Sequence, residues 1–291
     1  MRFRTISLVF FLFGSVLLSS CSSSDQERNR ERQQLLSDPG VVSYTFRNQF
    51  QEDFYGTLDF IRKIDIKNIE FSSLFGKTSA EVREALDERG LVCTSYGVGY
   101  DDLVNNPEQV VEDARILGAG HVRIAWIPHD SPFDIEDVKR AVTDFNHAGR
   151  ILNENGLKFA YHNHGFEFQA YEDGTLFDYL VQNTNADHVN FEMDLFWVAH
   201  PGQDPVALLE KYPQRFSLMH LKDLKKGVDG DFSGRAPNEY DVPLGTGQID
   251  YPAVLRAAKN TGIEHFYIED ESAEVHTRVP ESLKYIRSLV D

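Results

Sequence analysis

Short hydrophobic runs alternate along the chain with longer stretches in which apolar residues recur at helical spacing. The short runs are rich in β-branched and aromatic residues and predict strands at 41–46, 68–72, 91–96, 121–126, 157–162, 189–194, 216–221 and 265–269. The longer stretches predict helices at 57–64, 80–89, 107–117, 135–155, 176–182, 205–211, 251–260 and 281–289. Strands that alternate with helices are typical of a parallel α/β fold. Eight such units favour a closed barrel over an open sheet, so we expect a single (β/α)8 TIM barrel at residues 40–291.

One connection departs from this alternation. Residues 225–250 follow the seventh expected strand, show little periodicity and are rich in glycine and proline. Long irregular loops inside compact domains are usually functional. We therefore expect this segment to lie over the open end of the barrel as a lid, with a mobile surface excursion as the alternative.

The N-terminal segment has the pattern of an export signal. Two arginines precede an apolar stretch at 6–18, which ends in the sequence LSSC at Cys21. This ending resembles the lipobox of bacterial lipoproteins, in which the cysteine is lipid-modified after cleavage. We expect a lipoprotein signal peptide at 1–20, a flexible polar tether at 21–39, and an exported protein anchored to a bacterial membrane only through the lipid on Cys21. An ordinary secretory signal or a short membrane anchor is the alternative.

The charge of the chain argues against one class of partner, and its cysteines are few. The chain carries 29 Lys and Arg against 46 Asp and Glu, a net charge of −17. Because nucleic-acid backbones are bound by lysine and arginine, we expect no nucleic-acid partner. Apart from Cys21, Cys93 is the only cysteine, and its apolar surroundings predict a buried side chain.

Metal-competent side chains occur where four of the late expected strands end. They are Glu167, Asp194, His220 and Glu269, and the first three follow one another at intervals of 27 and 26 residues (194 − 167 and 220 − 194). One strand and one helix of a barrel occupy about that length, so the side chains are expected to converge on one face. Three carboxylates and an imidazole suit Mn²⁺, Mg²⁺, Co²⁺ or Zn²⁺. Taken singly, each residue could instead be a solvated loop residue, a helix cap or a core group.

The runs that contain these residues carry a family resemblance. YHNHGFEF (161–168), MDLFWVAHPGQDP (193–205), MHLKD (219–223) and YIEDE (267–271) resemble the sugar phosphate isomerase/epimerase family of xylose-isomerase-like TIM barrels, over about residues 41–289. The resemblance implies one divalent metal, with Mn²⁺ as the expected ion, held by Glu167, Asp194, His220 and Glu269. Many relatives place a glutamate earlier on the fifth strand, which leaves His162 or His164 as the alternative first ligand. In that case Glu167 would support the ligand without contacting the metal.

Two histidines on the expected fifth strand are candidates for contact with the substrate. His162 and His164 are two residues apart, so both side chains point to the same side of the strand. We favour His164 as a general base and His162 as a group that orients the substrate. The alternative is that one of them only hydrogen-bonds a neighbouring strand end.

Two further candidates come from the next strands. Lys222 follows His220 by two and is expected to place a cation beside a developing oxyanion, with a structural salt bridge to Asp223 or Glu192 as the alternative. Trp197 is expected to form an apolar wall for a sugar ring, unless it belongs to the core.

The resemblance and these residues together predict a metal-dependent carbohydrate enzyme. It would be an isomerase or epimerase, or a keto-glycoside lyase or hydratase, and would act by proton abstraction next to a carbonyl with Glu269 as a catalytic group. The expected partner is a small carbohydrate. The alternatives are a non-catalytic sugar-binding lipoprotein and an endonuclease IV-like metal nuclease, which the net charge disfavours.

Overall fold

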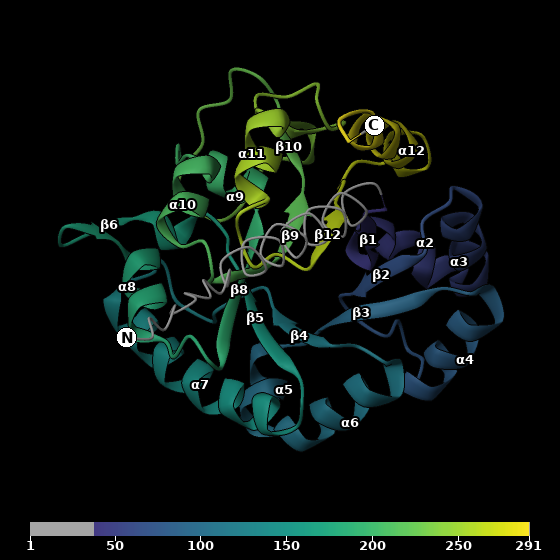
Figure 1. Ribbon diagram of the computed structural model, residues 1–291, viewed down its shortest axis with the longest axis horizontal. Coiled ribbons are helices and arrows are strands. Elements are labelled where there is room, and N and C mark those ends of the chain that lie inside the picture. Colours follow the sequence, from purple (N-terminus) through teal and green to yellow (C-terminus); the bar gives the residue numbers. More distant parts are fainter. Residues whose placement is uncertain (1–37, 291) are drawn as a thin grey trace, which may run out of the picture.

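Eight parallel strands close into a barrel in the computed structural model, which describes residues 38–290 (Figure 1). The order around the barrel is β1-β12-β9-β8-β5-β4-β3-β2, so the first and last strands pair with each other. The expected single TIM barrel is confirmed. The strands are β1 (Gly40–Val42), β2 (Asn68–Phe71), β3 (Val92–Gly97), β4 (His121–Ile124), β5 (Lys158–His162), β8 (Val189–Asp194), β9 (Phe216–Leu221) and β12 (His265–Ile268).

Helices join successive strands and surround the barrel (Figure 1). Local sequence explains their ends. In α4, Thr78 and Glu81 form a reciprocal capping box at the start, and Gly90 closes the helix with a left-handed φ of 62°. The helices are α2 (Arg47–Glu52), α3 (Phe54–Lys63), α4 (Ser79–Arg89), α5 (Tyr100–Asn105), α6 (Pro107–Leu117), α7 (Ile135–Glu154), α8 (Leu176–Asn183), α9 (Leu195–Ala199), α10 (Pro205–Lys211), α11 (Tyr251–Ala258) and α12 (Val275–Ser288).

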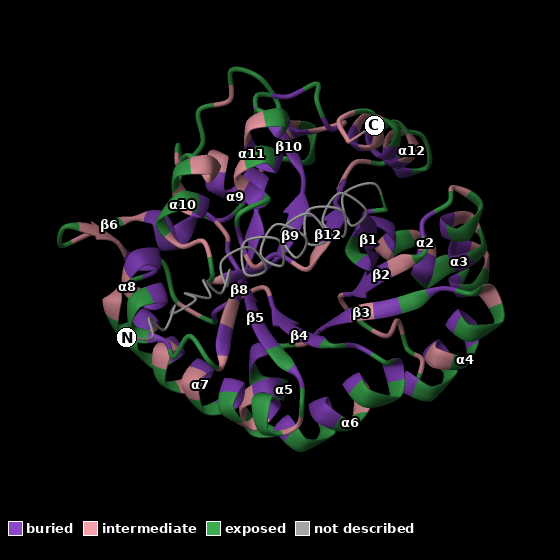
Figure 2. Ribbon diagram, in the orientation of Figure 1, coloured by how far each residue is buried: buried purple, intermediate pink, exposed green. Residues whose placement is uncertain are grey.

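The apolar core lies mainly between the strands and the helices. The strands are mostly buried, and the outer faces of the helices are exposed (Figure 2). In β8, Phe191 and Met193 belong to this core, whereas the alternate residues Glu192 and Asp194 face the barrel interior. Ala160, Leu218 and Tyr267 form a separate small apolar cluster. Each of these three stands two residues before a candidate site residue, so the apolar layer lies one pleat below the site.

Two expected elements differ from the observed ones. The first strand ends at Val42, and the 3₁₀ helix η1 (Ser43–Phe46) replaces its second half. The Ser43 hydroxyl there lies 3.0 Å from the Ser72 hydroxyl, a contact that local propensity does not reveal. The last helix begins at Val275 and includes Pro280, where the sequence had suggested a start after the proline.

The 225–250 segment is folded against the barrel. Residues 225–240 form a loop that is closed by the antiparallel pair β10 (Asp223–Leu224) and β11 (Asp241–Val242), and η3 (Asn238–Tyr240) precedes β11. The buried Asp223 carboxylate accepts hydrogen bonds from the backbone N–H groups of Gly245, Gly247 and Ile249, at 2.8, 3.0 and 3.3 Å. The one other hairpin of residues 38–290 pairs β6 (Ala170–Tyr171) with β7 (Gly174–Thr175).

The expected signal peptide at 1–20, the lipidation site Cys21 and the tether as far as residue 37 lie outside the described residues. Within residues 38–290, no helix combines the length and the apolar character that crossing a membrane requires. Cys93 is buried, and burial raises the pKa of its thiol to about 12.

Candidate metal centre

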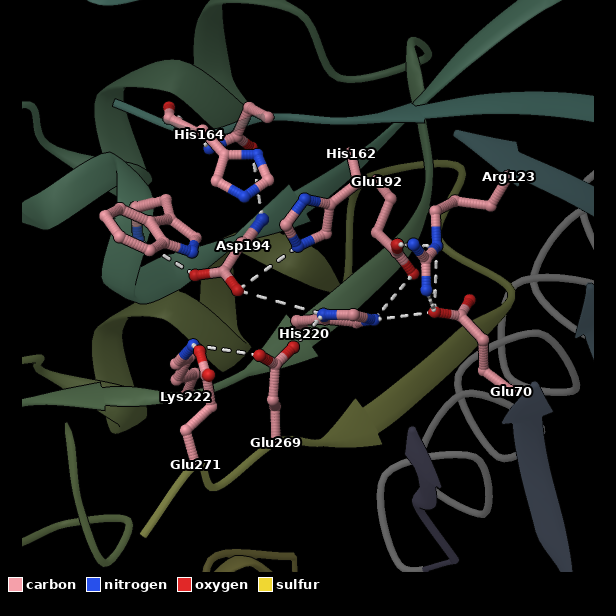
Figure 3. Close-up of polar contacts among 12 residues, drawn as sticks. Glu70, Arg123, His162, His164, Glu192, Asp194, His220, Lys222, Glu269 and Glu271 are labelled. Atoms are coloured by element: carbon pink, nitrogen blue, oxygen red, sulfur yellow. Dashed lines mark hydrogen bonds and ion pairs between the residues drawn. The ribbon is translucent and has the colours of Figure 1, made fainter. Parts of the chain in front are cut away.

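Four side chains from four strands converge at the C-terminal end of the barrel (Figure 3). His162 and Asp194 are the last residues of β5 and β8, His220 lies one residue before the end of β9, and Glu269 directly follows β12. Each offers a ligand atom within 4.8 Å of those of the others. Active sites of TIM barrels lie at this face, because the loops that follow the strands meet there.

The contacts inside this cluster are short. Nδ1 of His220 lies 2.6 Å from Oε2 of Glu269 and 3.7 Å from Oδ2 of Asp194, and Nε2 of His162 lies 3.3 Å from Oδ2 of Asp194. The backbone N–H of Trp197 donates to the other Asp194 oxygen at 2.9 Å, which fixes that carboxylate. All four side chains are buried.

The pKa values show that the cluster attracts positive charge. Burial by itself would lower the pKa of His220, but the surrounding carboxylates, Glu192 first, raise it well above its ordinary value. Burial would raise the pKa of Asp194, but hydrogen bonds from the two histidines hold it at about 2. Burial would also raise the pKa of Glu269, but the charge of Lys222 and the charge and hydrogen bond of His220 together hold it well below its ordinary value.

These residues fit a divalent cation. Two imidazoles and two carboxylates are ligands that Zn²⁺ and Mn²⁺ accept. Among residues 38–290, Nδ1 of His220 finds no hydrogen-bond partner, although Glu269 lies so near. Without a metal, the raised pKa of His220 places a proton in this position, and a bound divalent cation would replace that proton and take both atoms as ligands.

Glu167 does not join the cluster, which corrects the ligand set expected from the sequence. Glu167 lies in the 3₁₀ helix η2 (Phe166–Phe168), which turns its carboxyl group back toward the end of β5. There it accepts hydrogen bonds from the Tyr161 hydroxyl and from the backbone N–H of His164, the latter at 3.0 and 3.2 Å. The fourth position of the cluster is taken by His162. Burial raises the pKa of Glu167 to about 7.

A pocket of about 470 Å³ contains the cluster. Three of the four cluster residues line it, and Tyr44 and Trp126 contribute to its walls. The 225–250 segment also lines the pocket, through Gly234, Arg235 and Ala236. It therefore forms part of the pocket wall, at the end of the barrel where the sequence predicted it to lie.

His164 and Trp197 both line this pocket. The half-buried ring of His164 lies between Trp126 and Trp197, with ring centroids 5.2 Å from each. Burial, followed by the charge of His162, lowers the pKa of His164 well below its ordinary value, so its ring is neutral. Its Nδ1 atom has no hydrogen-bond partner within the described part of the chain.

Lys222 forms a buried network of ion pairs. Its buried ammonium group donates to Oε1 of Glu269 at 2.8 Å and to Oε1 of Glu271 at 2.6 Å, and it does not line the pocket. The salt bridges considered from the sequence, to Asp223 or Glu192, are not the ones it forms. These two contacts hold the Lys222 ammonium group against Glu269.

Three charged residues at the centre of the barrel were not identified as a group from the sequence. Glu70 on β2, Arg123 on β4 and Glu192 on β8 are buried and lie next to His220 (Figure 3). One signal was present in the sequence, because Glu192 stands two residues before Asp194 and therefore points to the same side of its strand. Glu70 and Arg123 are the third residues of the short strands β2 and β4, and the sequence around them contains no motif that singles them out.

Comparisons with known proteins agree with this architecture. A family model described as xylose isomerase-like TIM barrel matches residues 58–289. An inosose dehydratase of Clostridium beijerinckii is 28% identical over 141 residues, which cover 45% of this chain and 46% of the relative. The chain thus spans about half the length of the curated relatives it matches.

Solved structures are similar over most of the chain. A sugar phosphate isomerase/epimerase from Parabacteroides distasonis has a TM-score of 0.71 and 24% identity, over 87% of this chain and 95% of that one. The IolI protein, whose structure contains a zinc atom, has a TM-score of 0.67 and 16% identity, over 87% of this chain and 96% of that one. At these identities the likeness is one of fold.

Proposed function

The chain belongs to the xylose isomerase-like TIM-barrel family, and we propose that it is a divalent-metal-dependent enzyme that acts on a carbohydrate. The observation that carries this proposal is the convergence of His162, Asp194, His220 and Glu269 in the 470 Å³ pocket. Relatives are named for dehydration and for isomerisation or epimerisation. These reactions of sugars can all begin with removal of a proton from the carbon next to a carbonyl.

The proposed metal site takes its ligands from those four residues. When bound, a divalent cation would polarise substrate oxygens and stabilise the negative charge that follows proton removal. Mn²⁺ remains the expected ion, and Zn²⁺ is the second candidate because the IolI protein holds zinc and imidazole nitrogens suit it.

We assign roles to the other residues of the pocket from their positions. His164 is the proposed general base, since its unpartnered Nδ1 atom belongs to a ring that lines the pocket. Trp197 and Trp126 provide flat apolar surfaces on which a sugar ring can stack. Lys222 keeps Glu269 ionised and oriented through their 2.8 Å contact.

The substrate class follows partly from the N-terminal sequence. The lipobox that ends at Cys21 supports an exported, lipid-anchored protein. An exported enzyme would meet free sugars and glycosides more readily than phosphorylated sugars. We therefore extend the proposal to an epimerase or isomerase of free sugars, or to a lyase or hydratase of keto-glycosides.

Solvent-deuterium exchange tests the proposal. The purified protein, supplied with Mn²⁺ or Zn²⁺, is incubated in deuterium oxide with free sugars, inososes and 3-keto-glycosides. We expect deuterium at one carbon next to a carbonyl, and product analysis would then separate epimerisation from elimination. Metal analysis that found no bound divalent ion after loading, together with no exchange, would contradict the proposal and favour a sugar-binding protein.

Glu269→Gln supplies the matched variant. It retains the shape of the side chain but removes the charge that faces His220 and Lys222. We expect at least a hundred-fold loss of turnover, on the order of what a single catalytic group contributes, with circular dichroism unchanged. Activity near that of the wild type would remove Glu269 from the metal site and from proton transfer.

A further inference from the structure

A layer of three charged side chains lies at the centre of the barrel beside the metal-ligand candidates (Figure 3). Nε and Nη2 of Arg123 donate to Oε1 of Glu70 at 3.0 and 2.5 Å, and Nε also lies 3.3 Å from Oε2 of Glu192. Glu70 and Glu192 are fully buried and Arg123 is 6% exposed. Barrel interiors are usually filled by branched apolar residues, so a buried charged layer needs a reason.

This layer contacts the cluster through one residue, His220. Its Nε2 atom lies 2.9 Å from Oε1 of Glu70 and 3.2 Å from Oε1 of Glu192. Its Nδ1 atom points the other way, 2.6 Å from Oε2 of Glu269. Since an ionised carboxylate can only accept, Glu70 requires a hydrogen on Nε2. When a cation replaces the second ring proton, the lone pair of Nδ1 then faces the cluster.

Glu70, Glu192 and His220 could by composition hold a cation themselves. Arg123 already supplies the positive charge of this layer, because its guanidinium group contacts both carboxylates. A rigid guanidinium fork also fixes where the two carboxylates lie, as a hydrated metal ion or a lysine would not. The layer is therefore built to hold His220 rather than to bind a second metal.

We propose that Glu70, held by Arg123, is a positioning residue that sets the orientation and the protonated nitrogen of His220 and thereby the metal affinity of the site. This inference rests on the proposed metal-dependent function. Glu70 touches neither the pocket nor the other three cluster residues, so its effect passes through His220. Loss of such outer contacts to a ligating histidine typically weakens metal binding by about 10-fold to 100-fold.

Two substitutions at Glu70 separate position from charge. Glu70→Asp keeps the negative charge but shortens the side chain, so the contact with Nε2 is lost. Glu70→Gln removes the charge but keeps an oxygen that can accept the Nε2 hydrogen. If position matters, the Kd for Mn²⁺ or Zn²⁺ rises about 10-fold or more in Glu70→Asp and less in Glu70→Gln. The opposite order would show that Glu70 acts only through its charge, and would overturn the inference.

The measurement is calorimetric titration of the full-length metal-free protein, with ¹⁵N spectra of the histidine rings as a second readout. Recorded on the Zn²⁺-loaded proteins, the spectra should show Nε2 of His220 protonated in the wild type and a mixture of forms in Glu70→Asp. Arg123→Lys, which leaves Glu70 in place but removes the fork, should also raise the Kd, so the test survives if Glu70→Asp fails to fold. Affinity and spectra like those of the wild type in both variants would likewise overturn the inference.

A control at the opposite end of the barrel completes the experiment. Glu264→Gln removes the carboxylate that pairs with Lys158 where β12 and β5 begin, whereas the cluster ligands lie where these strands end. Its Kd should stay within about two-fold of the wild-type value, since positioning of His220 is untouched. Failure of the wild-type protein itself to bind either metal would count against the proposed function, a result distinct from a wrong order of the two Glu70 variants.

Discussion

Glu167→Gln should make the protein more stable at alkaline pH, although it removes a buried residue of the site region. Burial raises the pKa of Glu167 to about 7 in the folded protein, against an ordinary value of 4.5. The unfolded chain therefore loses this proton at lower pH than the folded chain. Its contribution to stability is present below the ordinary pKa and is lost as the pH rises toward 7.

The size of the effect follows from the two pKa values. At about 1.4 kcal/mol for each pKa unit, moving from 4.5 to about 7 corresponds to a loss of about 3 kcal/mol in the free energy of unfolding between those pH values. Glutamine resembles the protonated acid, and its carbonyl oxygen can still accept from the Tyr161 hydroxyl and the His164 N–H. The variant should therefore escape this loss.

Urea unfolding of both metal-free proteins at several pH values between 5 and 8 measures the effect. Contributions of other titrating groups largely cancel in the difference between the two proteins. We expect similar stabilities near pH 5 and a variant that is more stable by up to about 3 kcal/mol at pH 8. A difference that does not change with pH, or a variant less stable at pH 8, would refute the reasoning about Glu167.

Two further substitutions concern the 225–250 segment. Gly234→Ala would place a Cβ atom 2.6 Å from Cδ1 of Phe166 at a φ of 66°, so we expect a strained pocket wall and a KM raised several-fold. The control Gly227→Ala, with a similar φ of 76° and no atom within 4 Å, should leave KM unchanged. Equal KM values in the two variants would contradict the importance of the close packing at Gly234 for the pocket wall. Asp223→Ala would deprive the backbone N–H groups of Gly245, Gly247 and Ile249 of their acceptor. Because each unsatisfied buried donor costs about 1–3 kcal/mol and part of this cost is relieved by water, we expect a free energy of unfolding in urea that is lower by about 2–5 kcal/mol. A loss below about 1 kcal/mol would show that the loop finds other partners.

The strands of the barrel were predictable because their local and global requirements agree. In β8 and β9, short apolar runs stand between helices with clear start and stop signals, and both strands were placed at their observed bounds. The errors fall where a contact between residues far apart in the sequence decides the local structure. At η1, Ser43 hydrogen-bonds Ser72, which follows the neighbouring strand β2. The predicted start of α12 after Pro280 was wrong, because Val275 and Val279 before the proline are buried on the same helix face.

The candidate site was predictable to a similar extent. Asp194, His220 and Glu269 follow or end strands, so period and spacing alone bring them to one face, and the structure places them together. The choice between His162 and Glu167 depended on where β5 ends and on the turn made by η2, a matter of a few backbone dihedral angles. Spacing along the chain carries no information about such a turn.

The sequence by itself determined the barrel, the face on which its chemistry lies and three of the four candidate ligands, because strand and helix periods are local properties. Only the tertiary structure decided which charges meet. Lys222 pairs with Glu269 and Glu271, and Arg123 stands between Glu70 and Glu192, through contacts that join strands far apart in the chain. Charged groups buried in a closed barrel must find partners there, and the partners are set by the closure of the barrel rather than by neighbours in the sequence.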